Sequence, residues 1–168
     1  MAEYTHGRVE IRSWPDFCKD EIEAVINNLR PSDLHEAAVL GRTGPDVADR
    51  CRQVIGSTPL VYLVCLDGLP VFVWGATALL PHFVVLWGFG TVDTPKVVPA
   101  ISRYLVRQWL ASMGRAGVSR IEARLPSSCV DSLRWLKSWG MREECRLSGA
   151  TINGEPISQL SYTWNSAE

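Results

Sequence analysis

This 168-residue sequence lacks the segments that mark membrane, secreted or multidomain proteins. No apolar run approaches the roughly 20 residues that a membrane-spanning helix needs. The first residues, Met1-Ala2-Glu3-Tyr4, are polar and contain no signal-peptide core. Repeats, linkers and low-complexity stretches are absent as well. We therefore expect one domain over residues 1–168 and no membrane partner.

Paired cysteines are a second absence. The chain has five cysteines, an odd number, and no two of them are spaced as Cys-x-x-Cys. A disulfide framework or a zinc site is therefore not expected, and buried neutral thiols in a reducing compartment are the simpler interpretation. The chain also has only three histidines, from which no Ser-His-Asp or Cys-His arrangement can be assigned. We predict no metal-binding residues.

The residues that are present are those of an ordinary globular protein. Hydrophobic residues make up 46% of the chain and charged residues 21%, and a domain of this length buries roughly 70% of its unfolded surface. The net charge is −1, with more acid than base before residue 51 and the reverse after it. Such asymmetry can orient a protein on a charged partner but does not define its fold.

Helical spacing of apolar residues dominates the first third of the chain. The elements expected there are a strand over Val9–Ser13, a helix from Pro15-Asp16 to Leu29, a second helix capped by Ser32 or Asp33, and a third over Asp46–Ile55.

Strand patterns follow from residue 60. Leu60–Leu66 and Pro70–Leu79 flank Asp67-Gly68, a pair that favours a two-residue type I′ hairpin because this turn needs positive φ at both positions. His82–Phe89 is almost wholly apolar, which predicts a central strand covered on both faces.

The clearest helix pattern runs from Lys96 to Met113. At 100° per residue, one side of this helix collects the expected buried residues, Val98, Ile101, Leu105, Trp109 and Ser112. The opposite side collects three cations, Lys96, Arg103 and Arg107. These cations are either solvated or matched by an acidic surface on a partner.

The C-terminal part of the chain completes a sheet with helices. We expect a strand over Arg120–Leu125, a helix over Cys129–Trp139 capped by Gly140, and a hairpin of Glu143–Ile152 with Glu155–Trp164 joined by Asn153-Gly154. With two or three helical segments before residue 60, the order β-α-α-β-β-β-α-β-α-β-β predicts an α/β (α+β) domain with one mixed sheet and helices on both faces.

Two segments carry a family resemblance. Leu29–Glu36 (LRPSDLHE) follows the first helix pattern, and Ser132–Met141 (SLRWLKSWGM) closes a later helix. Together with the element order, they resemble the GNAT acetyltransferase superfamily, most closely its bacteriophage-encoded branch. The resemblance covers nearly the whole chain. It implies a GNAT fold with an acetyl-CoA site where the central strand meets the helix after it.

The turn at that position, Gly88–Pro99, departs from the glycine-rich pattern of the family. Members of the family hold the pyrophosphate on backbone N–H groups, which a helix N-terminus favours. The residues that could bind the cofactor here are Gly90, Thr91, Thr94 and Lys96. Pro95 and Pro99 have no N–H to donate, and Asp93 places a negative charge where phosphate would lie. We therefore expect a degenerate acetyl-CoA site.

The catalytic positions of the family are also changed. Many members protonate the departing thiolate with a Tyr four residues before the helix-ending glycine, and Leu136 occupies that position here. The Asn that often starts the same helix is replaced by Cys129. For a general base, the central strands offer only Asp67, at a turn, and His82, at a strand start. His35, beside Glu36, is interpreted as a solvated helix residue, so no catalytic residue is assigned.

Three functions remain open. The favoured one is a phage GNAT-fold protein that is not an enzyme and needs no cofactor. It would be a virion structural or assembly component in multi-copy contact with phage structural proteins, in the virion or the host cytoplasm. The alternative is an acetyl-CoA-dependent N-acetyltransferase acting on a small amine or a protein N-terminus. A nucleic-acid binder using the basic stretch Lys96–Arg146 is least favoured, because no recognition motif accompanies that stretch.

Overall fold

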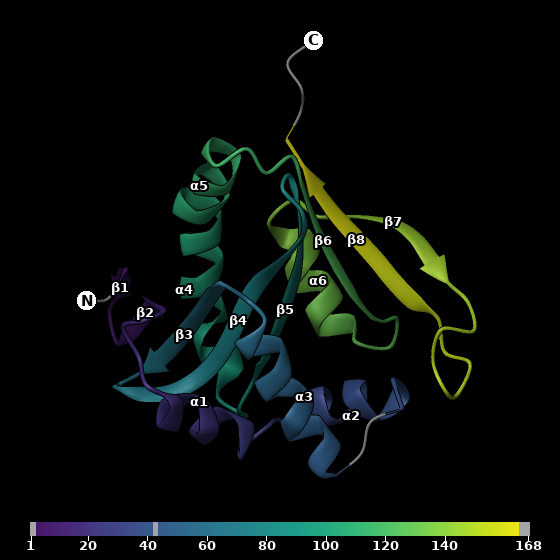
Figure 1. The fold of residues 1–168 in the computed structure, drawn as a ribbon, viewed down its shortest axis with the longest axis horizontal. Helices are drawn as coiled ribbons and strands as arrows, with labels where there is room; N and C mark the ends of the chain where they lie inside the picture. Colours follow the sequence, from purple (N-terminus) through teal and green to yellow (C-terminus); the bar gives the residue numbers. More distant parts are fainter. Residues whose placement is uncertain (1–2, 42–43, 165–168) are drawn as a thin grey trace.

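Eight strands form one mixed sheet (Figure 1). The computed structural model describes residues 3–41 and 44–164. Within them the strand order is β1-β2-β3-β4-β5-β6-β8-β7, in which β5 and β6 are parallel and the other neighbours antiparallel. The strands are β1 (Tyr4–His6), β2 (Val9–Ser13), β3 (Leu60–Leu66), β4 (Leu69–Leu80), β5 (Phe83–Gly90), β6 (Arg120–Pro126), β7 (Arg142–Leu147) and β8 (Ile157–Thr163).

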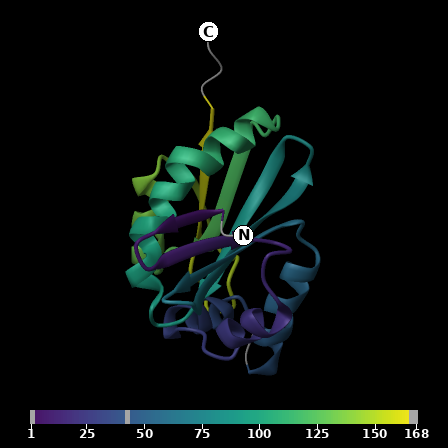
Figure 2. The same cartoon turned by 90° about the vertical axis from the view of Figure 1, so that its left-hand side faces the viewer.

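Helices cover both faces of this sheet, which confirms the predicted fold class. Figure 2 shows α4 and α5 on one side of the sheet and α3 on the other. The helical segments are α1 (Lys19–Ile26), α2 (Pro31–Val39), α3 (Pro45–Gly56), α4 (Thr94–Tyr104), the π-helical η1 (Leu105–Trp109), α5 (Leu110–Arg115) and α6 (Val130–Ser138). None of the helices in the described ranges is long and apolar enough to cross a membrane.

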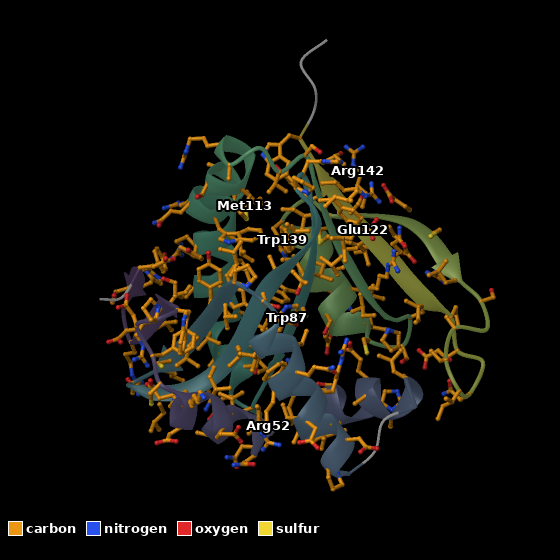
Figure 3. The ribbon with its side chains drawn as sticks, viewed as in Figure 1. Arg52, Trp87, Met113, Glu122, Trp139 and Arg142 are labelled. Carbon is orange, nitrogen blue, oxygen red and sulfur yellow. The ribbon has the colours of Figure 1, made fainter. Side chains whose placement is uncertain are left out.

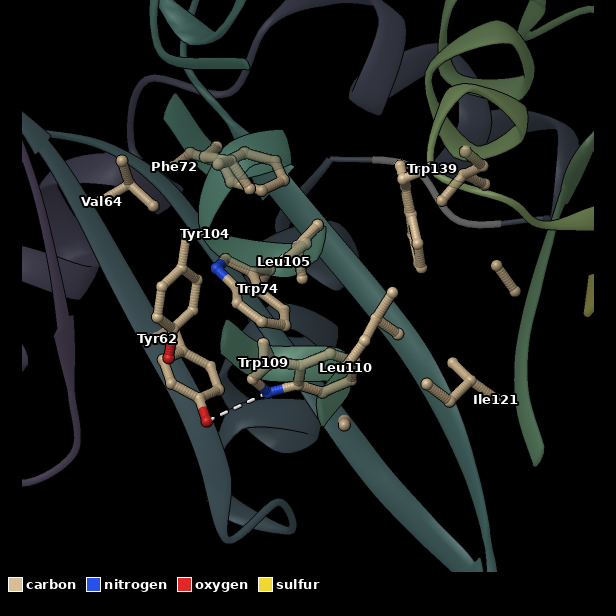
Figure 4. Close-up of a cluster of buried hydrophobic side chains, with 14 of the residues drawn as sticks. Tyr62, Val64, Phe72, Trp74, Tyr104, Leu105, Trp109, Leu110, Ile121 and Trp139 are labelled. Atoms are coloured by element: carbon tan, nitrogen blue, oxygen red, sulfur yellow. Dashed lines mark hydrogen bonds between the residues drawn. The ribbon is translucent and has the colours of Figure 1, made fainter. Parts of the chain in front are cut away.

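Alternation along the strands produces two apolar cores. On β3, Val61 and Leu63 pack with α1 and α3, whereas Tyr62 and Val64 face the core beneath α4 and α6. In the larger core, the Tyr62 and Trp74 rings stack with centroids 4.3 Å apart, and the indole N–H of Trp109 donates to the Tyr62 hydroxyl at 3.1 Å (Figure 4). This aromatic cluster fixes the long α4–α5 helix on the sheet.

The β3–β4 hairpin forms as predicted. Leu66 pairs directly with Leu69, which leaves a two-residue turn in which Asp67 has φ +52° and Gly68 has φ +78°. These are the positive values that a type I′ turn requires.

The C-terminal hairpin differs from the prediction. β7 and β8 are antiparallel, with Leu147 paired to Ile157, so nine residues and not two connect them. Asn153 and Gly154 lie inside this connection, which Thr151 organises by donating its hydroxyl to the Glu155 carbonyl at 2.6 Å. Asn153-Gly154 is therefore part of the loop, but it does not set the register between β7 and β8.

The N-terminal region also departs from expectation. Strand β1 was not predicted and pairs with β2. Helix α1 starts at Lys19, later than predicted, where Cys18 and Glu21 form a capping box. Helix α2 starts with Pro31 in its first turn and Arg30 as N-cap, so neither Ser32 nor Asp33 caps it.

The long helix after β5 contains a π-helical turn that shifts its buried face. Ile101, Leu105 and Trp109 are buried as predicted, but Val98 is half-buried and Ser112 exposed. The π-helical turn η1 inserts extra residues into the helical repeat, so the buried positions after it move to Leu110 and Met113. The cationic side changes too, because Arg103 is half-buried and contacts His6 of β1.

Candidate functional site

Strands β5 and β6 separate soon after they pair, and the gap between them is the candidate site. Only three residue pairs join them, from Phe83 with Arg120 to Val85 with Glu122. Beyond these pairs the strands diverge, so the middle of β5 is only partly buried. This corrects the prediction that the strand is covered along its length on both faces.

Two cavities border this gap, and a third lies near one of them. A narrow one of about 90 Å³ lies between β5, β6 and α6, where Trp135 and Leu136 line it. A second, of about 310 Å³, lies on the α2–α3 side of the sheet and shares Glu36, Trp87 and Arg124 with the first. A third, of about 440 Å³, opens near the starts of α2, α4 and α6 and shares Arg30 with the first. The first two cavities therefore adjoin each other at Glu36, Trp87 and Arg124. Figure 3 labels Trp87 of β5 near the middle of the molecule.

Glu36 of α2 lies where the narrow cavity meets the α2–α3 cavity. Burial, and after it the nearby negative charge of Asp33, together raise the pKa of its carboxyl group to about 7, while Arg30 acts in the opposite sense. No hydrogen bond or ion pair joins this carboxylate to another residue in the described ranges. A partly buried carboxyl group that ionises near neutral pH can accept a proton from a substrate.

Asp33 and Arg30 tie helix α2 to the end of β5. The Gly90 N–H donates to the Asp33 carboxylate at 2.7 Å, and the Arg30 N–H donates to the Gly90 carbonyl at 2.8 Å. The Arg30 guanidinium pairs with Asp33 at 2.8 Å. Burial nevertheless raises the pKa of Asp33, because its desolvation outweighs these favourable contacts.

The residues predicted to bind the cofactor are together at the β5–α4 turn, but their polar groups are already engaged. Besides the Gly90 amide, the Thr91 N–H donates to the Val71 carbonyl at 2.9 Å. The Thr94 hydroxyl donates to the Thr91 carbonyl at 2.7 Å, and the Lys96 ammonium pairs with Asp93 at 2.6 Å. The turn as it stands does not fit a pyrophosphate group, and the 90 Å³ cavity lies below the roughly 300–1,000 Å³ of ligand pockets.

Of the positions that the sequence suggested for catalysis, two lie at the candidate site and two lie away from it. Leu136 is buried and lines the narrow cavity, where it has no proton to donate. Cys129 lies at the start of α6, and burial followed by the negative charge of Glu36 raises the pKa of its thiol to about 11. Asp67 pairs with Arg8 at the hairpin turn, and His82 is exposed; neither lines the three cavities.

Glu36 and Arg124 are the site residues that sequence reasoning missed. Glu36 lies three residues after Asp33, so both fall on the same face of α2, and this spacing was a signal that could have been used. Arg124 gave no such signal, because its position at the cavity depends on the divergence of β6 from β5, which ends 34 residues earlier in the sequence. No group of three or more His, Cys, Asp or Glu residues in the described part of the chain is placed to hold a metal ion.

Comparisons with known proteins match this architecture. The yncA protein of Salmonella typhimurium, solved with its cofactor acetyl-CoA, superposes with a TM-score of 0.67 at 16% identity, covering 96% of this chain and 98% of that one. The GNAT-family acetyltransferase of Bacillus anthracis gives 0.63 at 15% identity, covering 95% and 96%. The ribosomal-protein-alanine N-acetyltransferase of Brucella melitensis gives 0.65 at 14% identity, covering 92% and 99%.

Sequence comparison adds nothing to this result, since no family model and no curated protein matches the chain. Identities of this size establish the fold alone. The fold expected from Leu29–Glu36, Ser132–Met141 and the element order is confirmed, whereas no comparison supports the bacteriophage branch. This chain has the fold of the GNAT-family acetyltransferases.

Proposed function

We propose that this chain is an N-acyltransferase that uses an acyl-CoA thioester and an amine acceptor, with Glu36 as the general base. The observation that carries the proposal is the position of Glu36 between the two cavities, with its pKa raised to about 7. The fold supports it through resemblance to acetyltransferases, which by itself is a weak argument for function.

The chemistry requires the amine to be neutral when it reacts. An aliphatic amine carries a proton at pH 7 and has no free electron pair in that form. The Glu36 carboxylate can accept this proton because its own pKa is near the working pH. Bound acetyl-CoA would supply the acyl carbon: the amine nitrogen would bond to it and lose a second proton, and the C–S bond would break. The departing thiolate would take its proton from water, because Leu136 has none to donate.

The activity test compares Glu36→Gln with Glu10→Gln, a glutamate of β2 outside the three cavities. We expect wild-type kcat/KM to rise with pH and level off above about 7, and Glu36→Gln to lower it by 10²–10⁴-fold and remove this inflection. Glu10→Gln should leave both unchanged. Thiol release from acetyl-CoA across an amine panel is the measurement. An unchanged rate and inflection in Glu36→Gln would exclude Glu36 as the base.

The polar groups of the β5–α4 turn are already hydrogen-bonded within the chain. We therefore predict weak binding of acetyl-CoA, with Kd above about 1 μM, which corresponds to a binding free energy of about −8 kcal/mol. Asp33→Ala removes the carboxylate that holds the Gly90 amide, so we expect it to tighten binding. Asp46→Ala, an exposed acid at the start of α3, is the control and should change nothing. Isothermal titration measures all three. Weaker binding in Asp33→Ala would mean that the Gly90 amide does not contact the phosphates.

A non-catalytic assembly component is the second candidate. It is favoured by the turn, where Gly90, Thr91 and Thr94 satisfy their hydrogen bonds within the chain. The phage origin and the virion partners rest on the sequence resemblance alone. Absence of acyl transfer to every amine in the panel, together with no acetyl-CoA binding by wild type or Asp33→Ala, would favour this candidate.

A further inference from the structure

We propose that the acceptor is a free α-amino acid with an apolar side chain, bound in the 310 Å³ cavity between α2, α3 and β5. The inference rests on the proposed function, which it makes specific. Three features of the cavity lining carry it: carboxylates, guanidinium groups and an apolar wall.

The carboxylates come from α2. Glu36 and Asp33 both line the cavity, and Glu36 also borders the narrow cavity between β5 and β6. An ammonium group beside Glu36 would stabilise its ionised form, which is the form that can accept a proton. The amine end of the acceptor therefore belongs at Glu36.

The guanidinium groups come from Arg124 of β6 and Arg50 of α3, which line the same cavity. The Arg124 guanidinium pairs with Glu122 at 3.1 Å, and Glu122 also pairs with Arg120 at 2.7 Å. Because a guanidinium has five N–H donors, Arg124 can bind a further carboxylate while it keeps this ion pair. Arg50 makes no ion pair within the described residues and bonds only to Gln53 at 2.8 Å. Arginine recognises carboxylates through paired hydrogen bonds.

Two cations in the cavity also argue against other acceptors. A simple alkylamine would pair with Glu36 but would offer no carboxylate to Arg124 and Arg50. A peptide or protein N-terminus has an amide where a free amino acid has its carboxylate, so Arg124 would keep only its ion pair with Glu122. An α-amino acid has the amine and the carboxylate on one carbon, and it matches both groups of charges.

The remaining wall of the cavity selects the side chain. It is formed by aliphatic and aromatic residues, Leu40, Val47, Val54 and Trp87. A cavity of 310 Å³ is at the lower end of the roughly 300–1,000 Å³ found for ligand pockets. We therefore expect a small apolar side chain, and L-leucine is the probe that we choose.

The test is calorimetric titration of the full chain with three ligands. L-Leucine has both charges, leucinamide lacks the carboxylate, and 4-methylpentanoate lacks the amine. We expect leucine to bind at least tenfold more tightly than either analogue. Arg124→Gln should weaken leucine at least tenfold and leave leucinamide unchanged, whereas Arg124→Lys should restore part of the loss. Arg134→Gln, an exposed arginine of α6 outside both cavities, is the matched control and should behave as wild type.

Several outcomes overturn the inference. Leucinamide that binds as tightly as leucine, or an equal loss of both ligands in Arg124→Gln, would exclude recognition of the carboxylate. If Arg124→Gln does not fold, Arg50→Gln replaces it and should weaken leucine alone. Acyl transfer to other amines without leucine binding would contradict this acceptor and keep the proposed function. Leucine binding without acyl transfer to any amine would keep the amino-acid site and contradict the proposed function.

Discussion

Glu36 shows how one side chain acquires its chemistry from its surroundings. An exposed glutamate on a helix has a pKa near 4.5, whereas the carboxyl group here is partly buried beside Asp33, which raises its pKa to about 7. Arg30 is the nearest compensating charge, but it is already paired with Asp33. Arg30 therefore offsets only part of the free energy that desolvation of the Glu36 carboxylate costs. Carboxyl groups with pKa values shifted in this way are common at functional sites.

The raised pKa of Glu36 predicts a pH-dependent difference in stability between wild type and Glu36→Gln. Below pH 4.5 the carboxyl group is protonated in both the folded and unfolded states, so the two proteins should differ little. Between about pH 4.5 and 7 the unfolded state ionises first, and wild type loses stability as the pH rises. Above pH 7 the difference should be constant, at most about 3 kcal/mol in favour of Glu36→Gln.

Urea denaturation of both proteins from pH 4 to pH 8 measures this difference. Glu10→Gln serves again as the control for loss of a glutamate outside the cavities. A stability gap between wild type and Glu36→Gln that stays constant with pH would show that the carboxyl group is not desolvated in the folded state.

At the scale of elements, the helix from Thr94 to Arg115 illustrates how a local irregularity changes a buried face. Leu105 and Trp109 flank its π-helical turn over residues 105–109, and both are buried; Trp109 packs against Trp74 with centroids 5.2 Å apart. After the turn the buried positions move to Leu110 and Met113. Such turns are often retained where a function depends on them. Here the turn also leaves Val106 on the exposed side.

Leu105→Ala should lower the free energy of unfolding by about 2–5 kcal/mol, because the Leu105 side chain is only 2% exposed and its removal leaves a cavity in the core. Val106→Ala is a matched control one residue away, 53% exposed, and should change stability by less than about 0.5 kcal/mol. Chemical denaturation compares the two. Similar small losses in both variants would show that the buried face is placed wrongly at this turn.

At the scale of the whole molecule, the five thiols differ in how far they are buried. All five cysteines are free: Cys51 and Cys65 lie in the core beneath α1 and α3, and Cys18 and Cys145 are exposed. Burial raises the pKa of the Cys51 thiol to about 11 and also raises that of Cys65.

Thiol labelling of the native protein should therefore separate the cysteines by position. At pH 7.5 we expect a thiol reagent to modify Cys18 and Cys145 rapidly, and Cys129 slowly, because its pKa of about 11 leaves little thiolate. Cys51 and Cys65 should react only after unfolding. Peptide mapping by mass spectrometry over time gives the order. Labelling of Cys65 as fast as Cys18 would contradict the two-faced packing of β3.

The sequence by itself determined the elements whose signals are local. The Asp67-Gly68 turn set a two-residue hairpin because backbone φ alone selects it, and alternation along β3 set which side chains face each core. The same reasoning failed at Asn153-Gly154, where pairing of β8 with both β6 and β7 decided the register. It also failed for the phase of the α4–α5 helix, because a π-helical turn has no distinct sequence pattern.

Only the tertiary structure decided the site. The Gly90 amide is occupied by a carboxylate 57 residues away, so the composition of the turn could not reveal whether it was free. The pKa of Glu36 depends on desolvation by β5 and β6 and on the charge of Asp33. Arg124 faces the same cavity only because β6 diverges from β5. Burial and charge act through space, and they are not encoded in the spacing of residues along the chain.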